Sequence, residues 1–218
     1  MTTVKSVTFT CPCCGQDFTS HYCPTTNSLG PTTTDFFDMA AGEQPIHYKV
    51  HTCTHCGFSC EEMEKGELSR QVKKFVRDNI TPKLTGDEIP SWTKFEFLAL
   101  IDENVGSDPY SLGMIYLHAA WCAYDQKQTE AEARFRKKAI RYLEKAFTPE
   151  TLDRDLLYLI PYLVAEQYRR TGEEESALQW YGYIIAMEEE HPDKVFFVSM
   201  AVQQSTDPKE LMGEVMYQ

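Results

Sequence analysis

The chain of 218 residues carries 21 basic and 33 acidic side chains, a formal net charge of -12, and 42% of its residues are hydrophobic. This length and hydrophobic fraction favour a folded core over general disorder, while the negative charge argues against a general grip on nucleic acid or an anionic membrane. The N-terminus has no apolar signal region and no run is long enough to span a bilayer, so we expect a cytoplasmic protein without membrane contact.

Two matched cysteine pairs stand out near the N-terminus. The stretches "TCPCCG" (10–15) and "TCTHCG" (52–57) both contain Cys-x-x-Cys-Gly, a tight turn that presents two thiolates and ends on a left-handed glycine. Short β-like runs at 7–10 and 46–52 precede the pairs, as in a zinc ribbon. Four such sulfurs suit a tetrahedral zinc ion, and the predicted ligands are Cys11, Cys14, Cys53 and Cys56.

Other uses of the cysteines stay open. Rubredoxins hold one iron between two similar knuckles, which would make the protein an electron carrier, and "CPCC" resembles the redox motif of thioredoxin-like folds. We favour zinc because no β-α-β unit surrounds Cys14 and because structural zinc is the commoner use of such a module. Cys13 and His55 occupy interior knuckle positions and are expected to be bystanders. Cys23 and Cys60 are either small buried residues or, with His21 or His51, parts of a second site.

The segment between the pairs, residues 24–45, reads as a loop, in which "DFFDM" (35–39) forms a turn of helix or an exposed apolar anchor. We therefore divide the chain into a metal-binding module, 1–62, and a helical domain, 63–218. The module alone buries little core, so a structural zinc would contribute on the order of 10 kcal/mol to its folding.

From residue 61 onward the apolar residues recur with helical period. Asp108 with Pro109 marks one helix start, and Thr129 with Glu132 forms the pattern of a capping box. Pro161 either kinks the fifth helix or marks its first turn, and we favour the kink. The predicted helices cover 61–80, 91–104, 108–126, 129–147, 148–172 and 173–190.

Short connections between these helices predict antiparallel hairpins. The small and aromatic residues of 162–185 follow the spacing of a tetratricopeptide helix pair, and 109–147 is a looser copy. Because two copies are fewer than a solenoid needs, helix 91–104 and the C-terminal stretch 206–217 are expected to cap the array. The predicted fold is mainly α, with a small zinc-ribbon-like β module followed by tetratricopeptide-like hairpins.

One basic run, "RFRKKAIR" (134–141), interrupts the acidic composition. It is either a solvated helix face or a groove for a partner, and on an acidic protein it favours an acidic protein segment over nucleic acid. The candidate partner-binding residues are Arg134, Lys137, Lys138 and Arg141.

No catalytic motif is visible in the sequence. There is no Ser-His-Asp arrangement, no phosphate-binding glycine loop and no HExxH motif, although catalytic groups can also meet from distant positions. The sequence thus favours a non-catalytic, zinc-stabilised protein-interaction module. The alternatives are a rubredoxin-like or thiol redox protein and, with less support, nucleic-acid binding through the ribbon and the basic helix.

Several motifs also carry a family resemblance: "FTCPCCGQDF", "CTHCGF", "YLHAAWCAYD" with the following "EAEARFRKKAIRYLEKAF", and "LLYLIPYLVAEQYRRTGEEESALQWYGYII". Over residues 5–187 the chain resembles the prokaryotic family catalogued as domain of unknown function 2225. The resemblance implies a zinc-ribbon-like knuckle set with ligands at the two cysteine pairs, followed by tetratricopeptide-like helices. It implies no established catalytic activity.

Overall fold

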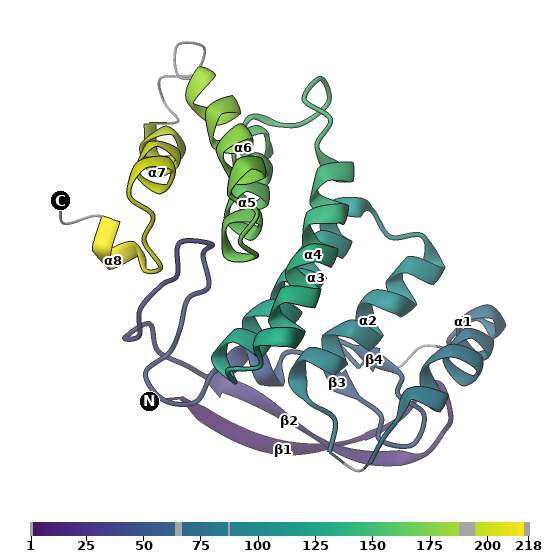
Figure 1. Cartoon of the computed structure of the whole chain (residues 1–218). Helices are drawn as coiled ribbons and strands as arrows, with labels where there is room; N and C mark the ends of the chain where they lie inside the picture. The colour runs from purple at the N-terminus through teal and green to yellow at the C-terminus, as the bar shows by residue number, and fades with distance from the viewer. Residues whose placement is uncertain (1, 64–66, 87, 188–194, 216–218) are drawn as a thin grey trace.

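The structure is a computed structural model that describes residues 2–63, 67–86, 88–187 and 195–215. A small β module lies at the base of a row of helices, and the chain then runs from helix to helix away from it (Figure 1). The chain is mainly helical, as predicted. None of the described helices is long and apolar enough to cross a membrane.

Two short antiparallel hairpins form the β module. Strands β1 (Thr3–Thr10) and β2 (Asp17–Thr25) pair with Phe9 opposite Phe18, and β3 (His51–Thr52) pairs with β4 (Ser59–Cys60). The predicted strand 46–52 is wrong in its first half, because Pro45 opens a 3-10 turn, η1 (Pro45–Tyr48). A proline φ near -65° suits the start of a helical turn and removes a donor that a strand needs.

The helical part begins with a short irregular segment and continues with longer helices. The segment comprises α1 (Arg70–Phe75), the π-helical turn η2 (Val76–Ile80) and η3 (Thr81–Lys83). The remaining helices are α2 (Ser91–Val105), α3 (Pro109–Asp125), α4 (Thr129–Ala146), α5 (Arg154–Arg170), α6 (Glu174–Ala186), α7 (Val195–Thr206) and α8 (Met212–Val215).

Helix starts follow the available caps. Asp108 caps α3 by accepting from the N–H of Ser111, as predicted, and Asp153 caps α5, which therefore begins later than residue 148. The predicted capping box at Thr129 is wrong, since α4 begins at Thr129 itself and its N-cap residue, Gln128, makes no side-chain cap bond. Pro161 lies inside α5, which excludes the interpretation that it starts the helix.

Two other helix predictions need correction. The predicted helix 61–80 becomes helical only at Arg70, capped by the Ser69 hydroxyl, while its residues 64–66 lie outside the described ranges. The acidic end of the predicted helix 173–190 also lies outside them from residue 188 onward. Helix α7 was not predicted.

Each helix from α2 to α7 packs on the next, and α3–α4 and α5–α6 form hairpins compatible with tetratricopeptide-like pairs. Gly113 of α3 allows the close approach of α4, because a Cβ there would lie 2.8 Å from Leu143 Cγ and Cδ2. A second core lies between the cysteine module and the first helices, and it unites Phe18 and Phe58 with Val76, Ile80 and Phe97. The proposed boundary after residue 62 stays a prediction.

The 31–39 part of the loop that connects the two knuckles packs on the helices. It rises between α8 and the helices α3 to α5 (Figure 1), where Thr33 bridges Leu211 and Phe37 stacks on Trp121 of α3 with ring centroids 5.4 Å apart. Phe37 is buried, so the expectation of an exposed apolar anchor in "DFFDM" is wrong for this residue. The Phe37 ring packs against Trp121 in the helical core and is not exposed to solvent.

Candidate metal centre

The two cysteine knuckles are built by the same backbone hydrogen bonds. In the first, the N–H of Cys11 donates to Gln16 and that of Gly15 donates to the Cys11 carbonyl, at 2.9 and 2.8 Å. In the second, the N–H of Cys53 donates to Phe58 and that of Gly57 donates to the Cys53 carbonyl, at the same two distances. Gly15 and Gly57 have φ values of +76° and +79°, the left-handed conformation that the sequence pattern predicts.

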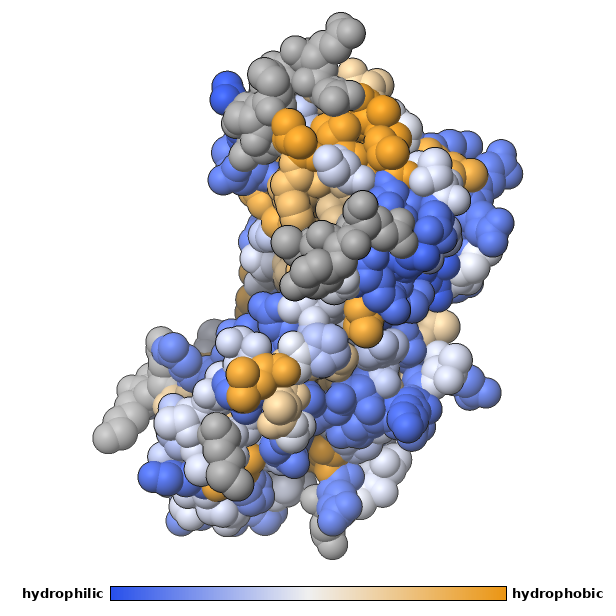
Figure 2. Space-filling model, turned by 90° about the vertical axis from the view of Figure 1, so that its left-hand side faces the viewer, coloured by the Kyte–Doolittle hydropathy of each residue, from blue (hydrophilic) through white to orange (hydrophobic). Residues whose placement is uncertain are grey.

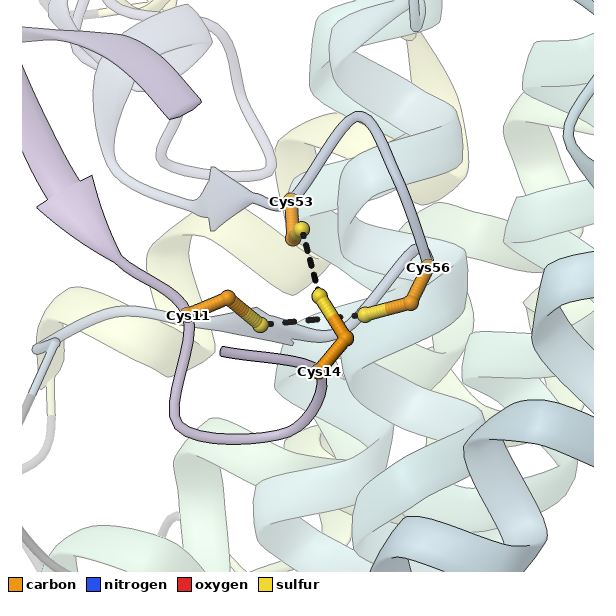
Figure 3. A group of neighbouring side chains, drawn as sticks. All are labelled: Cys11, Cys14, Cys53 and Cys56. Atoms are coloured by element: carbon orange, nitrogen blue, oxygen red, sulfur yellow. Dashed lines mark hydrogen bonds between the residues drawn. The ribbon is translucent and has the colours of Figure 1, made fainter. Parts of the chain in front are cut away.

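The knuckles bring Cys11, Cys14, Cys53 and Cys56 together around one point (Figure 3). The sulfurs of Cys11 and Cys56 lie 3.7 Å apart, as do those of Cys14 and Cys53, and all four lie within 4.8 Å of one another. Sulfurs that surround a zinc ion tetrahedrally at about 2.3 Å are about 3.8 Å apart, whereas a disulfide needs about 2.05 Å. The cluster therefore has the geometry of a four-thiolate metal site, and its cysteines are unbridged.

The electrostatics of the cluster favour a bound cation. Hydrogen bonds from Cys53 and Cys56 lower the pKa of Cys11 to about 2, so a thiolate forms readily at one position. The contact with Cys11 raises the pKa of Cys53 to about 12 and raises the pKa of Cys56 well above its usual range. Further thiolates are thus opposed by the first one. A divalent cation removes this opposition, because it binds all four sulfurs in the thiolate form.

The other cysteines lie outside this cluster. Cys13 is partly exposed at the tip of its knuckle, Cys23 donates to the carbonyl of Thr25 at 3.1 Å, Cys60 contacts the sulfur of Met63, and Cys122 is buried in α3. Within the described ranges, these cysteines and the histidines form no second group with metal-ligand geometry.

A basic surface beside the knuckles was not predicted. Arg70, Lys73, Lys74 and Arg77 of α1 and η2, here called the α1 cations, line a pocket of about 480 Å³ together with Cys13, Cys14 and Cys56. Arg77 pairs with Asp78, whereas no carboxylate of the described chain pairs with the other three. The basic residues at 70, 73, 74 and 77 recur with helical spacing, and this pattern in the sequence could have predicted a basic surface. Its position beside the cysteines is visible only in the fold.

The predicted partner-binding residues lie along α4 and differ in their contacts. Arg134 and Lys138 both bind Glu96 of α2, at 3.1 and 2.8 Å. Lys137 and Arg141 line a surface pocket of about 380 Å³ with Glu144, Tyr168 and Glu173. The role of all four in partner binding stays a prediction.

Arg136, in the middle of the same basic run, is fully buried. Its Nη1 lies 2.8 Å from Oδ2 of Asp35 in the 31–39 loop, and Asp35 also receives a hydrogen bond from Trp121 Nε1 at 2.9 Å. Arg170 of α5 lies 3.5 Å from the other carboxylate oxygen. Part of the basic run thus has a structural role that the sequence alone did not reveal.

Comparison with known proteins adds one match. A family model described as "Uncharacterized protein conserved in bacteria (DUF2225)" matches residues 5–206. No curated protein and no solved structure matches the chain.

Proposed function

The chain belongs to the DUF2225 family of bacterial proteins, and the match supplies no activity. From the geometry of the site, we propose that the protein is a zinc-stabilised module for protein interaction. The observation that carries this proposal is the closed four-sulfur cluster at the base of the helical row. Four cysteine ligands leave no open coordination position, which is typical of structural zinc and not of catalytic zinc. The metal would fix the module so that the helices can be presented to a partner.

Metal analysis tests the first half of the proposal. We expect the purified, colourless protein to contain one zinc per chain. A red protein with one iron per chain would instead support the rubredoxin-like alternative.

A matched pair of variants tests the ligand set. Cys53→Ser removes one ligand and should release the metal, whereas Cys23→Ser removes a cysteine outside the cluster and should leave the metal content unchanged. Structural zinc contributes on the order of 10 kcal/mol, and a loss of only a few kcal/mol already lowers the melting temperature by roughly 10 °C. Full metal retention in Cys53→Ser would refute the assignment.

Two exposed surfaces support the interaction role. The first is the pair Lys137 and Arg141 on α4, which border a surface pocket where an acidic segment could bind. Lys137 lies 3.4 Å from Glu173, and both side chains are largely exposed, so an acidic segment would compete with Glu173 for this cation. The second is on α7, where Val195, Phe196 and Val202 are exposed. Figure 2 shows an apolar area near the top of one face of the molecule. Exposed apolar side chains that gather in one place are typical of interaction sites.

Charge reversal tests the basic surface. We expect Lys137→Glu with Arg141→Glu to keep the metal content and the melting temperature but to lose co-purifying partners. Lys5→Glu with Lys83→Glu changes the net charge equally at exposed positions far along the chain from α4 and serves as the control. An identical set of co-purifying proteins in both double variants would count against an α4 partner site.

A second candidate function, nucleic-acid binding, is favoured by the α1 cations beside the ribbon. If the protein binds nucleic acid here, the logarithm of the binding constant should fall linearly with the logarithm of the salt concentration. The slope should be roughly -0.9 for each phosphate that the protein neutralises. Lys73→Glu with Lys74→Glu should abolish such binding. Absence of salt-sensitive binding to both DNA and RNA eliminates this candidate.

A further inference from the structure

Three side chains from distant parts of the chain form a hydrogen-bonded series where the β module meets the helices. His47 lies in η1, Ser91 is the first residue of α2 and Asp125 is the last residue of α3. Nδ1 of His47 lies 2.8 Å from Ser91 Oγ, and Nε2 lies 2.8 Å from Asp125 Oδ2. Sequence inspection missed this series because its members are separated by 44 and 78 positions from His47.

The protonation of the series follows from its partners. A carboxylate only accepts hydrogen bonds, so the neutral imidazole carries its proton on Nε2 and donates it to Asp125. Nδ1 then has a free lone pair and accepts the hydroxyl proton of Ser91. This is the relation of nucleophile, base and orienting acid found in serine hydrolases, with the two ring nitrogens exchanged.

The hydroxyl end of the series opens on a pocket. A depression of about 660 Å³ is lined by Ser91 and His47 together with Tyr48, Trp92, Lys94 and Glu88. Ser91 is only 6% exposed, and the His47 side chain is 10% exposed, so both are shielded from bulk water while they border this space. A hydrogen-bonded series that only held η1 against α2 and α3 would not need a pocket of ligand size beside the Ser91 hydroxyl.

Groups that stabilise negative charge lie next to Ser91. The amide of Trp92 is in the first turn of α2, where N–H groups lack helical acceptors, and no described residue accepts from it. Lys94, one turn along, borders the pocket and forms no ion pair with a described carboxylate. Burial lowers the pKa of Lys94. Glu88 on the same wall disfavours a strongly anionic ligand and favours a neutral acyl group.

We propose that Ser91, His47 and Asp125 form an acyl-transfer site that hydrolyses a small neutral ester or thioester. Ser91 Oγ bonds to the carbonyl carbon as its proton moves to His47 Nδ1; the bond to the leaving group breaks, and the leaving group takes that proton. Water then attacks the acylated serine, passing its proton through Nδ1 back to Ser91 Oγ as the acid departs. Asp125 stabilises the imidazolium that forms in each half. This activity goes beyond the interaction role and does not depend on it.

Neighbouring groups provide internal comparisons. Burial raises the pKa of Cys122, which contacts Ser91, to about 12, so this thiol does not compete as a nucleophile at neutral pH. Ser20 Oγ lies 2.9 Å from His51 Nδ1 at the same pocket, but no described carboxylate contacts His51. The Ser20–His51 pair is thus a serine and histidine without the orienting acid.

The test uses the full metal-loaded chain and a fluorophosphonate reagent, which modifies activated serines. Intact mass and peptide mapping should show one adduct, on Ser91, with the Ser20 peptide unmodified. His47→Gln and Asp125→Asn should slow labelling by at least about 100-fold, because a positioned general base contributes roughly 10²–10⁴-fold. The same variants and Ser91→Ala should lose hydrolysis of p-nitrophenyl acetate and of a phenyl thioacetate.

Metal content and melting temperature identify any variant that fails to fold. In that case the mapping of the unaltered protein decides the question by itself. An adduct confined to Ser91 supports the proposal. An adduct on Ser20, or no adduct at all, overturns it and leaves the series as a structural clamp.

Discussion

At the residue scale, the two knuckle glycines allow a controlled comparison. Gly57 and Gly15 share the left-handed conformation, but a Cβ on Gly57 would lie 2.6 Å from Ile80 Cγ2, whereas a Cβ on Gly15 would meet nothing within 4 Å. Alanine at either position incurs backbone strain of about 1–2 kcal/mol. Only Gly57→Ala adds overpacking, which costs about 1–3 kcal/mol. We expect urea unfolding to show the larger destabilisation for Gly57→Ala, and equal losses would contradict the packing argument.

His118 of α3 gives the protein a specific sensitivity to acid. Its Nδ1 is buried without a hydrogen-bond partner, and its ring lies 5.1 Å from that of Trp121. Burial, aided by the charge of Lys49, lowers the pKa of His118 to about 3. In the unfolded chain the pKa is about 6.5, so below this pH the unfolded state binds the extra proton. The stabilisation is complete above about pH 6.5 and is lost as the pH falls toward 3.

Replacing the imidazole by an apolar ring should remove this dependence. We expect the free energy of unfolding of the unaltered chain to fall by up to about 1.4 kcal/mol per pH unit more than that of His118→Phe between pH 6 and pH 4. His21→Phe, at an exposed position, controls for the loss of any imidazole. Parallel stability curves for the unaltered protein and His118→Phe would show that His118 is not the linked group.

At the element scale, the 31–39 loop holds the middle helices to one another. Asp35 is fully buried, and burial by itself would raise its pKa, but the nearby Arg170 and Arg136 outweigh this effect and hold the pKa well below its usual range. The carboxylate therefore remains charged between α4 and α5. Arg136 also pairs with Glu132, and Arg170 also pairs with Glu166 and Glu210, but of these carboxylates only Asp35 contacts both arginines.

Neutralising Asp35 should accordingly damage the helical array. Removal of one member of a buried ion pair costs about 3–5 kcal/mol. Asp35→Asn leaves Arg136 paired only with Glu132, and Arg170 only with Glu166 and Glu210. We expect a loss of this size for Asp35→Asn in urea unfolding. Asp38→Asn changes an exposed carboxylate of the same loop and should cost about 1 kcal/mol or less. A small effect at both positions would show that the loop is not an anchor.

The same scale shows what the sequence could predict. Local chemistry was sufficient for the cysteine knuckles and for the start of α3 at Asp108, because a few adjacent residues determine each of them. Helix α7 was missed because "VFFVSMAV" is apolar on successive positions and lacks helical period. The contacts of Asp35 with Arg136 and of His47 with Ser91 join residues 101 and 44 positions apart, and no local pattern records them.

At the scale of the whole molecule, the cysteine cluster stabilises more than its own hairpins. Val72, Val76 and Ile80 of α1 and η2 pack on Cys11, Cys53 and Cys56, and Phe97 and Ile101 of α2 complete this core. The core between α5, α6 and α7 contains none of these residues. Removing the metal should therefore destabilise the cysteine module and the first helices before it affects α5, α6 and α7.

Hydrogen exchange after treatment with a strong metal chelator tests this order. We expect amides of 51–60 and 70–80 to lose protection first, because their core includes the sulfurs that would then repel one another. Amides of α5 and α6 should keep their protection, since helix–helix packing and the Asp35 cluster hold them independently. In Cys53→Ser, the amides of 51–60 and 70–80 should already lack protection before the chelator is added, and the chelator should change their exchange little. Simultaneous loss across α5 and α6 would mean that the chain unfolds as one unit, and unchanged exchange at 70–80 would mean that the metal does not support the first helices.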